Sequence, residues 1–480
     1  MKGMILFFFS VLLIMNLSIA HVEAMDRQKL VDLIDNDPAL EGALLSVSVR
    51  SAKTGEVLYE HLANTRLRPA SNMKLFTAAA ALSVLGEHHR FTTELYMDGK
   101  IKWKILDGDL YIKGNGDPTL LGKDIDELVR QLKIQGVRII KGNLIADDSR
   151  YDDERYPIDL PWSDEETYYG AQVSALTVAP DDDYEAGTVV IEVTPGKEIN
   201  DKGEVTVSPG SDTLMLVNKS TTIEANQKLD LKISREHGTN VIYIDGVIPK
   251  NASTHKESIA IWEPTDYVLH LFKQTLKEQG ITLLGSIKKG KLPLTAKKLT
   301  THESMPLSEL LVPFMKQSNN GHAEILIKEM GYVREEEGTW DKGLNVLEEE
   351  LKQWNIETEK MVIRDGSGIS HVSGIPTHQI SGLLYEIQAE PWFSIFLQSL
   401  PLVDGGVPLD RGTLNDRLKQ TVASRRVRAK TGTLTTVSSL AGYVEPKEGE
   451  ALVFSIISNQ IIDGDKAKDL EDQLVLALLE

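Results

Sequence analysis

The chain has 480 residues, of which 41% are apolar and 26% are charged, and it carries a formal net charge of −19. This composition excludes a disordered, collagenous or multi-span membrane protein, and the acidic balance argues against non-specific nucleic-acid binding. The sequence contains no cysteine, which excludes disulfides, thiolate metal sites and a cysteine nucleophile. At roughly 100–200 residues per domain, the length predicts about three structural units or one domain with large insertions.

Residues 1–24 have the pattern of a secretory signal peptide. Lys2 supplies a positive start, Met4 to Ala20 is almost continuously apolar, and small residues allow cleavage after Ala20 or Ala24. The alternative is an uncleaved membrane anchor, but this 17-residue run is at the short limit for a bilayer span. We therefore expect a protein exported across the cytoplasmic membrane, to the cell-wall zone or periplasm, with no stable membrane span in its mature form.

A β-hairpin is predicted first, from runs rich in Val and Leu at residues 44–49 and 57–61 that flank a turn. An Ala-rich segment follows the Ser/Asn start at residues 71–72, and it predicts a helix that ends near Gly86. Because the side chains of this helix are small on every face, we expect neighbouring elements to pack closely around it.

The last third of the chain predicts several helices and then three strands. The helices are expected at 307–315, 322–330 and 344–354, the strands at 426–434, 439–444 and 452–458, and an amphipathic helix at the C-terminus. Pairing the three strands with the N-terminal hairpin gives an α+β fold with one antiparallel five-stranded sheet flanked by helices.

The middle of the chain is predicted to be inserted into this sheet domain, which then comprises residues 25–92 and 300–480. Residues 93–187 and 256–299 mix strand and helix patterns with acidic loops, and we expect them to form one mixed domain. Between them, apolar and polar residues alternate over 188–255, which predicts a nested small all-β domain.

Ser71 and Lys74 stand three residues apart at the start of the Ala-rich helix, so their side chains lie on one face about a turn apart. A serine nucleophile needs a base nearby, and a lysine can serve if burial and neighbouring positive charge hold it neutral. The helix N-terminus also directs N–H groups toward the serine oxygen, where an oxyanion would develop. The spacing alone is weak, because residues 253–256 and 286–289 share it and a helix N-cap beside a solvated lysine gives the same pattern.

Two further motifs strengthen this pattern. Ser318-Asn319-Asn320 is the one Ser-x-Asn in the sequence and lies between two predicted helices. Lys430-Thr431-Gly432 begins a predicted strand, where a cation beside the nucleophile can hold a substrate carboxylate and Gly432 lets backbone approach closely. A second Lys-Thr-Gly at 53–55 occupies the hairpin turn and is interpreted as structural.

In this order, the three motifs resemble those of the penicillin-recognising serine enzymes, whose catalytic domain has a β-lactamase/transpeptidase-like fold. The 244 positions from Lys74 to Ser318 indicate the low-molecular-mass class C D-alanyl-D-alanine carboxypeptidase/endopeptidase family, because compact β-lactamases leave far fewer. One departure from the family pattern is Asn319, where relatives often carry Asp. Other family-like stretches span nearly the whole mature chain: Pro69–Thr77, Gly114–Pro118, Asp147–Ser149, Tyr169–Ala171 and Asp365–Gly368.

The resemblance implies a role for each matched residue. Ser71 would attack the carbonyl between two terminal D-alanines of a peptidoglycan stem peptide, with Lys74 as general base. Ser318 would relay a proton to the leaving D-alanine, and Asn320 would hydrogen-bond the substrate backbone. Water would then hydrolyse the acyl-enzyme, whereas β-lactams mimic the dipeptide and leave a slowly hydrolysed adduct.

Further residues are expected to bind the substrate. The resemblance implies that Lys430 and the hydroxyls of Thr431 and Thr433 bind the terminal carboxylate. The backbone N–H groups of Ser71 and Thr433 would form the oxyanion hole. The expected substrate-binding set is Thr431, Gly432, Thr433, Ser367 and Gly368, the last two on the far side of the pocket.

Two other functions stay open at this point. A β-lactamase would use the same acylation with fast deacylation, although the long insertion argues against it, and a non-catalytic cell-wall-binding protein would account for the size of the inserted domains. No metal or cofactor is expected, since none of the eleven histidines has His-Glu-x-x-His spacing. Expected partners are peptidoglycan stem peptides and β-lactam antibiotics, not nucleic acid. The sequence leaves open the oligomeric state and the balance of carboxypeptidase and endopeptidase activity.

Overall fold

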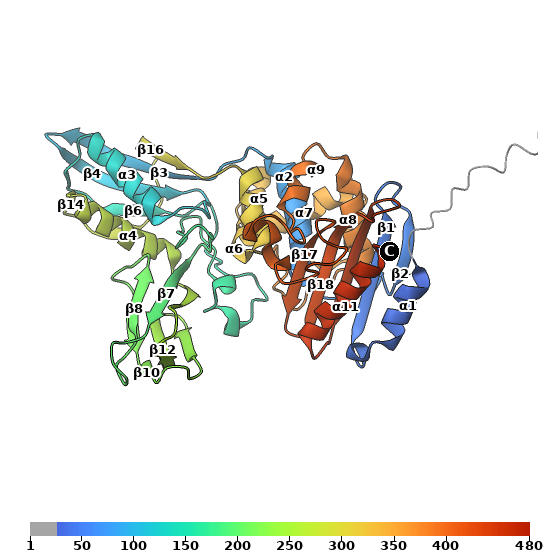
Figure 1. Cartoon of the computed structure of the whole chain (residues 1–480). Coiled ribbons are helices and arrows are strands. Elements are labelled where there is room, and N and C mark those ends of the chain that lie inside the picture. The colour runs from blue at the N-terminus through green and yellow to red at the C-terminus, as the bar shows by residue number, and fades with distance from the viewer. Residues whose placement is uncertain (1–25) are drawn as a thin grey trace, which may run out of the picture.

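The computed structural model describes residues 26–480, so the predicted signal peptide at 1–24 lies outside the described residues. Within 26–480, the chain forms one part built on a five-stranded sheet and a second part built on three further sheets (Figure 1). In that same range, no helix combines the length and the apolar character that crossing a bilayer requires.

The five-stranded sheet joins the two ends of the chain. Its spatial order is β17–β18–β19–β1–β2, and all neighbouring strands are antiparallel. This confirms the predicted α+β fold, since the N-terminal hairpin pairs with the three C-terminal strands. The strands are β1 (Leu44–Ser51), β2 (Val57–His61), β17 (Val427–Leu434), β18 (Val437–Val444) and β19 (Leu452–Asn459).

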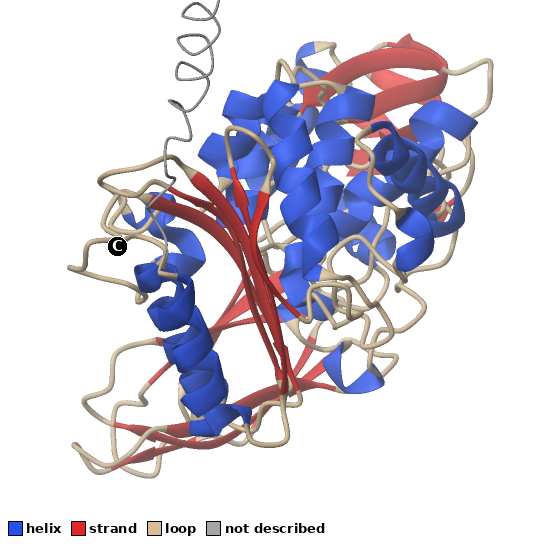
Figure 2. Cartoon of the chain, turned by 90° about the vertical axis from the view of Figure 1, so that its right-hand side faces the viewer, coloured by secondary structure: helices blue, strands red, loops and turns tan. Residues whose placement is uncertain are grey.

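Helices cover both faces of this sheet, and Figure 2 shows the C-terminal helix on one side and a larger group of helices on the other. Every residue of β18 and β19 is buried as a result, which is why these strands are almost continuously apolar. One face packs against α1 (Arg27–Asn36) and α11 (Gly464–Ala477). The other packs against α2 (Met73–Leu85), α5 (Leu307–Lys316), α6 (Asn320–Glu335), α7 (Trp340–Gln353), α8 (Thr377–Glu386) and α9 (Phe393–Ser399).

The Ala-rich helix α2 is central, as expected. Residues 73–82 are all buried, and the helix ends at Gly86, whose φ of +81° is a conformation that favours glycine. A helix made of small side chains lets its neighbours approach on every side, so the start of α2 is held rigidly.

The second part of the molecule lies to the left in Figure 1 and is built largely around a seven-stranded sheet. Two helices, α3 (Gly122–Ile134) and α4 (Pro264–Glu278), bury their apolar faces in its core. The strands of this sheet are β3 (Thr92–Lys102), β4 (Ile105–Gly114), β5 (Ile139–Ile140), β6 (Leu144–Asp147), β14 (Thr282–Leu283), β15 (Ile287–Lys289) and β16 (Lys297–Glu303).

Two smaller sheets come from the strand-rich stretch in the middle of this part. A three-stranded sheet contains β7 (Thr188–Thr194), β8 (Glu204–Ser208) and β13 (His255–Ala260). A four-stranded sheet contains β9 (Met215–Asn218), β10 (Thr221–Ile223), β11 (Asp230–Arg235) and β12 (Val241–Pro249). The short helix α10 (Pro408–Arg411) belongs to the other part and precedes β17.

The two parts meet along α6. Near the C-terminal end of this helix, Arg150 donates two hydrogen bonds to the buried carboxylate of Glu329, at 2.8 and 2.6 Å. Lys328 pairs with Asp152 and lies 3.8 Å from the centre of the Trp340 ring. We call this contact region, which joins residues 150–152 to α6 and the start of α7, the junction.

Candidate active site

Ser71 lies in a short 3₁₀ turn, Ala70–Asn72, that leads directly into α2. Ala70 has a φ of +48°, a conformation that costs a non-glycine residue about 1–3 kcal/mol and is typical of functional sites. The three-residue spacing brings the Nζ of Lys74 to 3.0 Å from the Oγ of Ser71. The predicted nucleophile and base are therefore in hydrogen-bond contact.

Lys74 is fully buried, and its three hydrogen-bond partners are uncharged. Besides Ser71, they are the Oδ1 of Asn320 at 2.6 Å and the backbone carbonyl of Ser367 at 2.9 Å. The last two can only accept, so a neutral amine donates both its N–H groups to them and turns its lone pair toward the Ser71 hydroxyl. Burial lowers the pKa of Lys74 to about 7, against the opposing effect of nearby carboxylates, so the neutral form is accessible near neutral pH.

The Ser-x-Asn motif forms the entry to α6. Asn319 caps the helix by accepting the N–H of His322 at 3.0 Å, and Ser318 has a φ of +63°. The Nδ2 of Asn320 donates to the carbonyl of Tyr169 at 3.0 Å, while its Oδ1 accepts from Lys74. Both polar atoms of this amide thus have protein partners. The hydrogen bond to Tyr169 fixes the amide so that its oxygen faces Lys74.

The Lys-Thr-Gly motif lies on β17. Lys430 is fully buried, and its Nζ donates to Ser318 Oγ and to the carbonyl of Thr431, both at 2.8 Å. Burial, assisted by the charge of Lys74, holds the pKa of Lys430 well below its ordinary value. The hydroxyl of Thr431 donates to that of Thr413 at 2.6 Å. Lys430 is therefore buried beneath Ser318 and Thr431 and donates hydrogen bonds to both.

Two glycines permit close backbone contact around the serine. A Cβ on Gly432 would lie 2.9 Å from both the Ser71 nitrogen and the Pro69 carbonyl oxygen, so β17 runs directly against the Ser71 turn. Gly368 has a φ of +83°, and a Cβ there would lie 1.8 Å from the carbonyl oxygen of Ala70. Neither position tolerates a larger residue without movement of the serine.

These elements surround one cleft of about 440 Å³. Lys74, Lys430 and Ser367 lie behind its wall; Ser367 contributes its carbonyl, and its hydroxyl accepts the N–H of Ile369 at 3.3 Å. The predicted residues that line the cleft itself are Ser71, Ser318, Asn320, Gly368, Thr431, Gly432 and Thr433. The structure thus brings together side chains that the sequence separates by more than 350 positions, from Ser71 to Lys430.

The chain matches the family described as D-Ala-D-Ala carboxypeptidase 3 (S13) over residues 27–480. It is also 41% identical over 433 residues to a D-alanyl-D-alanine carboxypeptidase from Actinomadura sp. (strain R39), which covers 89% of this chain and 80% of that protein. The chain belongs to the D-Ala-D-Ala carboxypeptidase 3 (S13) family. This confirms the family predicted from the sequence and, with it, the class of serine-type carboxypeptidases.

More distant relatives agree on the fold. The D-alanyl-D-alanine carboxypeptidase DacB of Haemophilus influenzae is 25% identical over 441 residues, covering 90% of this chain and 88% of that protein. The crystal structure of penicillin binding protein 4 (dacB) from the same organism superposes with a TM-score of 0.80 at 24% sequence identity, and covers 94% of this chain and 98% of that one. The β-lactamase/transpeptidase-like architecture is thereby confirmed.

Several residues of this S13 site were not predicted. The carbonyl of Tyr169 and the hydroxyl of Thr413 each contact a predicted residue, and the buried carboxylates of Glu324 and Asp365 lie near Lys74. Tyr169 and Asp365 fall in family-like stretches, and Glu324 stands one helical turn after Asn320, which is the signal that could have indicated it. For Thr413 the sequence offers no signal.

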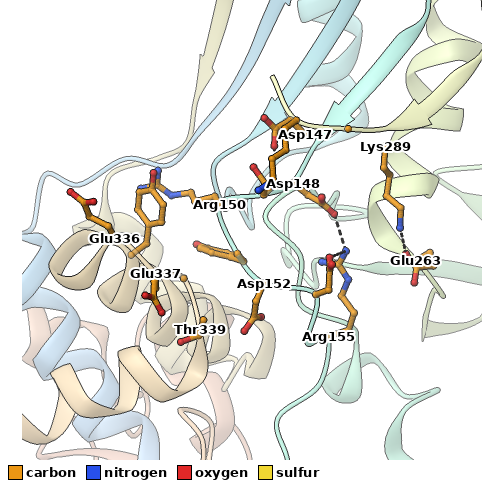
Figure 3. Close-up of a pocket in the computed structure, with 17 residues that line it drawn as sticks. Asp147, Asp148, Arg150, Asp152, Arg155, Glu263, Lys289, Glu336, Glu337 and Thr339 are labelled. Carbon is orange, nitrogen blue, oxygen red and sulfur yellow. Dashed lines mark hydrogen bonds and ion pairs between the residues drawn. The ribbon is translucent and has the colours of Figure 1, made fainter. Parts of the chain in front are cut away.

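A second and larger pocket, of about 730 Å³, lies beside the junction (Figure 3). It is lined by charged side chains that already pair with one another, such as Arg155 with Asp148 at 2.8 Å and Lys289 with Glu263 at 2.7 Å. The family-like stretch Asp147–Ser149 therefore lies here and not in the catalytic cleft. Among residues 26–480, no group of three or more His, Asp or Glu side chains is arranged to hold a metal ion.

Proposed function

We propose that the chain is an exported serine D-alanyl-D-alanine carboxypeptidase that removes the terminal D-alanine of peptidoglycan stem peptides through an acyl-serine intermediate. The observation that carries this proposal is the position of the Lys74 amine, 3.0 Å from Ser71 Oγ and hydrogen-bonded to two pure acceptors. The substrate is supported by family membership and by the names of the relatives.

Acylation begins when neutral Lys74 accepts the Ser71 proton as Oγ attacks the carbonyl carbon of the penultimate D-alanine. The N–H groups of Ser71 and Thr433 stabilise the oxyanion, a role supported by the close passage of β17 along the Ser71 turn. The C–N bond then breaks, and the proton taken from Ser71 leaves on the D-alanine nitrogen, relayed by the Ser318 hydroxyl. Water hydrolyses the acyl-serine and returns the enzyme to its starting state.

The terminal carboxylate is bound at the opposite side of the cleft. Thr431 and Thr433 line the cleft, and their hydroxyls are available to the carboxylate. Lys430 is buried, and it donates to the Ser318 hydroxyl and to the carbonyl of Thr431. We infer that Lys430 acts on the substrate mainly by holding these groups and by its charge.

Acylation by a fluorescent penicillin tests the proposal. We expect one covalent adduct, located on Ser71 by mass spectrometry of the digested protein, and no adduct in Ser71→Ala. Label that survives in Ser71→Ala would contradict the assigned nucleophile. Rapid turnover of nitrocefin would favour a β-lactamase instead, and release of D-alanine from a pentapeptide that is lost in Lys74→Ala would exclude a non-catalytic wall-binding protein.

Export is tested separately by cell fractionation and N-terminal sequencing of the mature protein. We expect the protein outside the cytoplasmic membrane, with a new N-terminus after Ala20 or Ala24. A protein that stays in the cytoplasm with its N-terminus intact would contradict this part of the proposal while leaving the chemistry untouched.

A second activity, D,D-endopeptidase cleavage of cross-linked peptides, is favoured by one observation. A cavity of about 500 Å³ shares Tyr168, Tyr169 and Gln317 with the catalytic cleft, so the cleft continues into space that a second peptide can occupy. We expect purified protein to cut cross-linked muropeptide dimers as well as pentapeptides. Release of D-alanine without any dimer cleavage would remove this second activity and keep the first.

A further inference from the structure

Two buried carboxylates, Glu324 on α6 and Asp365 in the loop itself, accept hydrogen bonds from the backbone of residues 365–370. Glu324 accepts the backbone N–H of Ser367 at 2.9 Å with one oxygen and that of Gly366 at 3.1 Å with the other. Asp365 accepts the N–H groups of Gly368 at 2.7 Å and Ser370 at 2.6 Å. Four backbone donors of one loop therefore end on two carboxylates.

The contacts of Glu324 reach the general base through one residue, Ser367. Its carboxylate accepts the N–H of Ser367, and the carbonyl of Ser367 accepts the Lys74 amine at 2.9 Å. The other pure acceptor of Lys74 is Asn320, which stands one turn before Glu324 on α6. The helix α6 therefore positions both of these acceptors. It carries Asn320 itself, and it holds Ser367 through Glu324.

Glu324 is itself firmly held. It is 3% exposed, and the indole N–H of Trp340 donates to its Oε2 at 2.8 Å. Three N–H donors thus converge on this carboxylate, although its partners include no cation. Burying a carboxylate without an ion-pair partner is costly, and a loop of this kind could be held by neutral groups at lower cost. The placement therefore calls for a reason beyond folding.

We propose that Glu324 is a positioning residue for the general base: its carboxylate holds the N–H groups of Gly366 and Ser367, and the carbonyl of the Ser367 residue fixed in this way directs the Lys74 amine toward Ser71. This inference rests on the proposed acyl-serine mechanism. It assigns to the Ser367 backbone, and not to its hydroxyl, the part that this residue plays in catalysis.

The charge of Glu324 has a second effect on Lys74. Three acidic groups influence the pKa of the amine: Glu324 on α6, Asp365 in the loop and Glu185 before β7. The neighbouring cation is Lys430 on β17, whose own pKa is lowered by Lys74. When ionised, the three carboxylates favour the ammonium form and raise the pKa of Lys74, whereas burial lowers it to about 7. Burial also raises the pKa of Asp365 to about 7 and that of Glu185 to about 8, so these two are only partly ionised near neutral pH. Removing the Glu324 charge therefore lowers the pKa of Lys74 further, so that the amine becomes neutral at a lower pH.

Glu324→Gln tests the proposal through the pH dependence of acylation by penicillin, measured as a rate constant per labelled site. In the wild type, the rate constant rises with pH through an apparent pKa of about 7, because only neutral Lys74 acts as a base. In Glu324→Gln, we expect this rise to move to lower pH from the loss of one nearby charge, by less than about one unit, because Asp365 ionises more readily without the Glu324 charge and offsets part of the change. We expect the plateau to fall by about 10²-fold, because the glutamine amide cannot accept both N–H groups and the amine is misplaced.

Two further variants separate position from charge and from stability. Glu324→Asp keeps the charge but shortens the reach, so the plateau should fall about 10-fold while the rise stays near the wild-type pH. Glu329→Gln, a matched control on the same helix, removes a buried carboxylate that faces Arg150 at the junction, and its profile should match the wild type.

The outcomes distinguish this inference from the proposed function. If the wild type shows no Ser71-dependent acylation, the proposed function itself fails. If the wild type is acylated on Ser71 but Glu324→Gln keeps the wild-type plateau and pH profile, the positioning role is overturned. Should Glu324→Gln fail to fold, a wild-type plateau in Glu324→Asp overturns it instead.

Discussion

Lys74 in the catalytic cleft and Lys328 in the junction are both buried lysines whose pKa is lowered by burial, but they are surrounded differently. Lys328 pairs with the carboxylate of Asp152, donates to the carbonyl of Glu154 at 2.6 Å and lies over the Trp340 ring. Lys74 instead contacts a hydroxyl, an amide oxygen and a backbone carbonyl.

The difference is the one expected between a lysine that stabilises the structure and the general base of the proposed mechanism. An ion pair and an aromatic face stabilise the charged form of Lys328, so this residue serves as a fixed cation that holds the two parts of the molecule together. The neutral acceptors around Lys74 can bond both its ammonium form and its neutral amine form. Because none of them is a carboxylate, burial lowers the pKa of Lys74 to about 7. Both regions include residues of α6, which contributes Asn320 to the cleft and Lys328 to the junction, but the buried lysine of the cleft, Lys74, comes from α2.

The largest effect is expected from Lys74→Ala. Without the base, the rate constant of Ser71 acylation by penicillin should fall by about 10³-fold, within the usual contribution of general base catalysis. Stopped-flow or quenched labelling measures this rate constant, and the rise with pH near 7 should disappear with it. An unchanged rate constant would mean that another group deprotonates Ser71.

Lys328→Met, the counterpart in the junction, should affect stability and leave the chemistry intact. Removing Lys328 takes away its ion pair with Asp152, whose side chain is 28% exposed and can be solvated in part, so we expect the free energy of unfolding to fall by about 1–3 kcal/mol. Denaturant titration measures this change. Acylation per folded site should stay within about 2-fold of the wild type, since Lys328 touches none of the cleft residues. A loss of acylation like that of Lys74→Ala would contradict the distinction between the two lysines.

Two glycines extend the comparison to the backbone. In Gly432→Ala, the new methyl group would lie 2.9 Å from the Ser71 nitrogen, so β17 must move away from the serine and acylation should fall by roughly 10–100-fold. In Gly338→Ala, at the junction, the methyl group would lie 2.4 Å from the Arg150 carbonyl oxygen and should lower stability by about 1–3 kcal/mol. The penicillin-labelling rate and the thermal midpoint of both variants measure these effects. Normal acylation in Gly432→Ala together with slow acylation in Gly338→Ala would contradict the comparison.

The smallest effect is expected from Thr413→Val. The valine cannot accept the hydrogen bond from Thr431, so the Thr431 side chain is no longer held in place at the edge of the cleft where the substrate carboxylate is proposed to bind. A lost hydrogen bond of about 1 kcal/mol corresponds to a roughly 5-fold rise in KM for a D-Ala-D-Ala peptide, with kcat little changed. Steady-state release of D-alanine measures both, and a fall in kcat alone would place Thr413 elsewhere in the mechanism.

The sequence was sufficient to predict the central sheet and to single out motif residues that the structure brings together around one cleft. Strands such as β18 and β19 are buried on both faces and leave a continuous apolar run, and the motifs around Ser71, Ser318 and Lys430 are short and ordered. These are local patterns, so they can be recognised without knowing the contacts.

Other features depend on contacts that no local pattern encodes. The helix α1 was not predicted, and its place against α11 is set by residues at the other end of the chain. The partner of the Asn320 amide is the backbone carbonyl of Tyr169, 151 positions away, and the carbonyl of Ala70 lies against Gly368, almost 300 positions away. Glu324 bonds two backbone nitrogens of the loop at 365–370, and a backbone acceptor or donor leaves no trace in residue type.

The hydrogen bond from Asn320 to Tyr169 has a consequence for any attempt to shorten this enzyme. A truncated version that keeps all three motifs but deletes residues 93–299 would lose the carbonyl that stops the Asn320 amide from rotating. We therefore expect the inserted residues to support the proposed reaction, and a shortened version to need a substitute acceptor before its serine reacts at a normal rate.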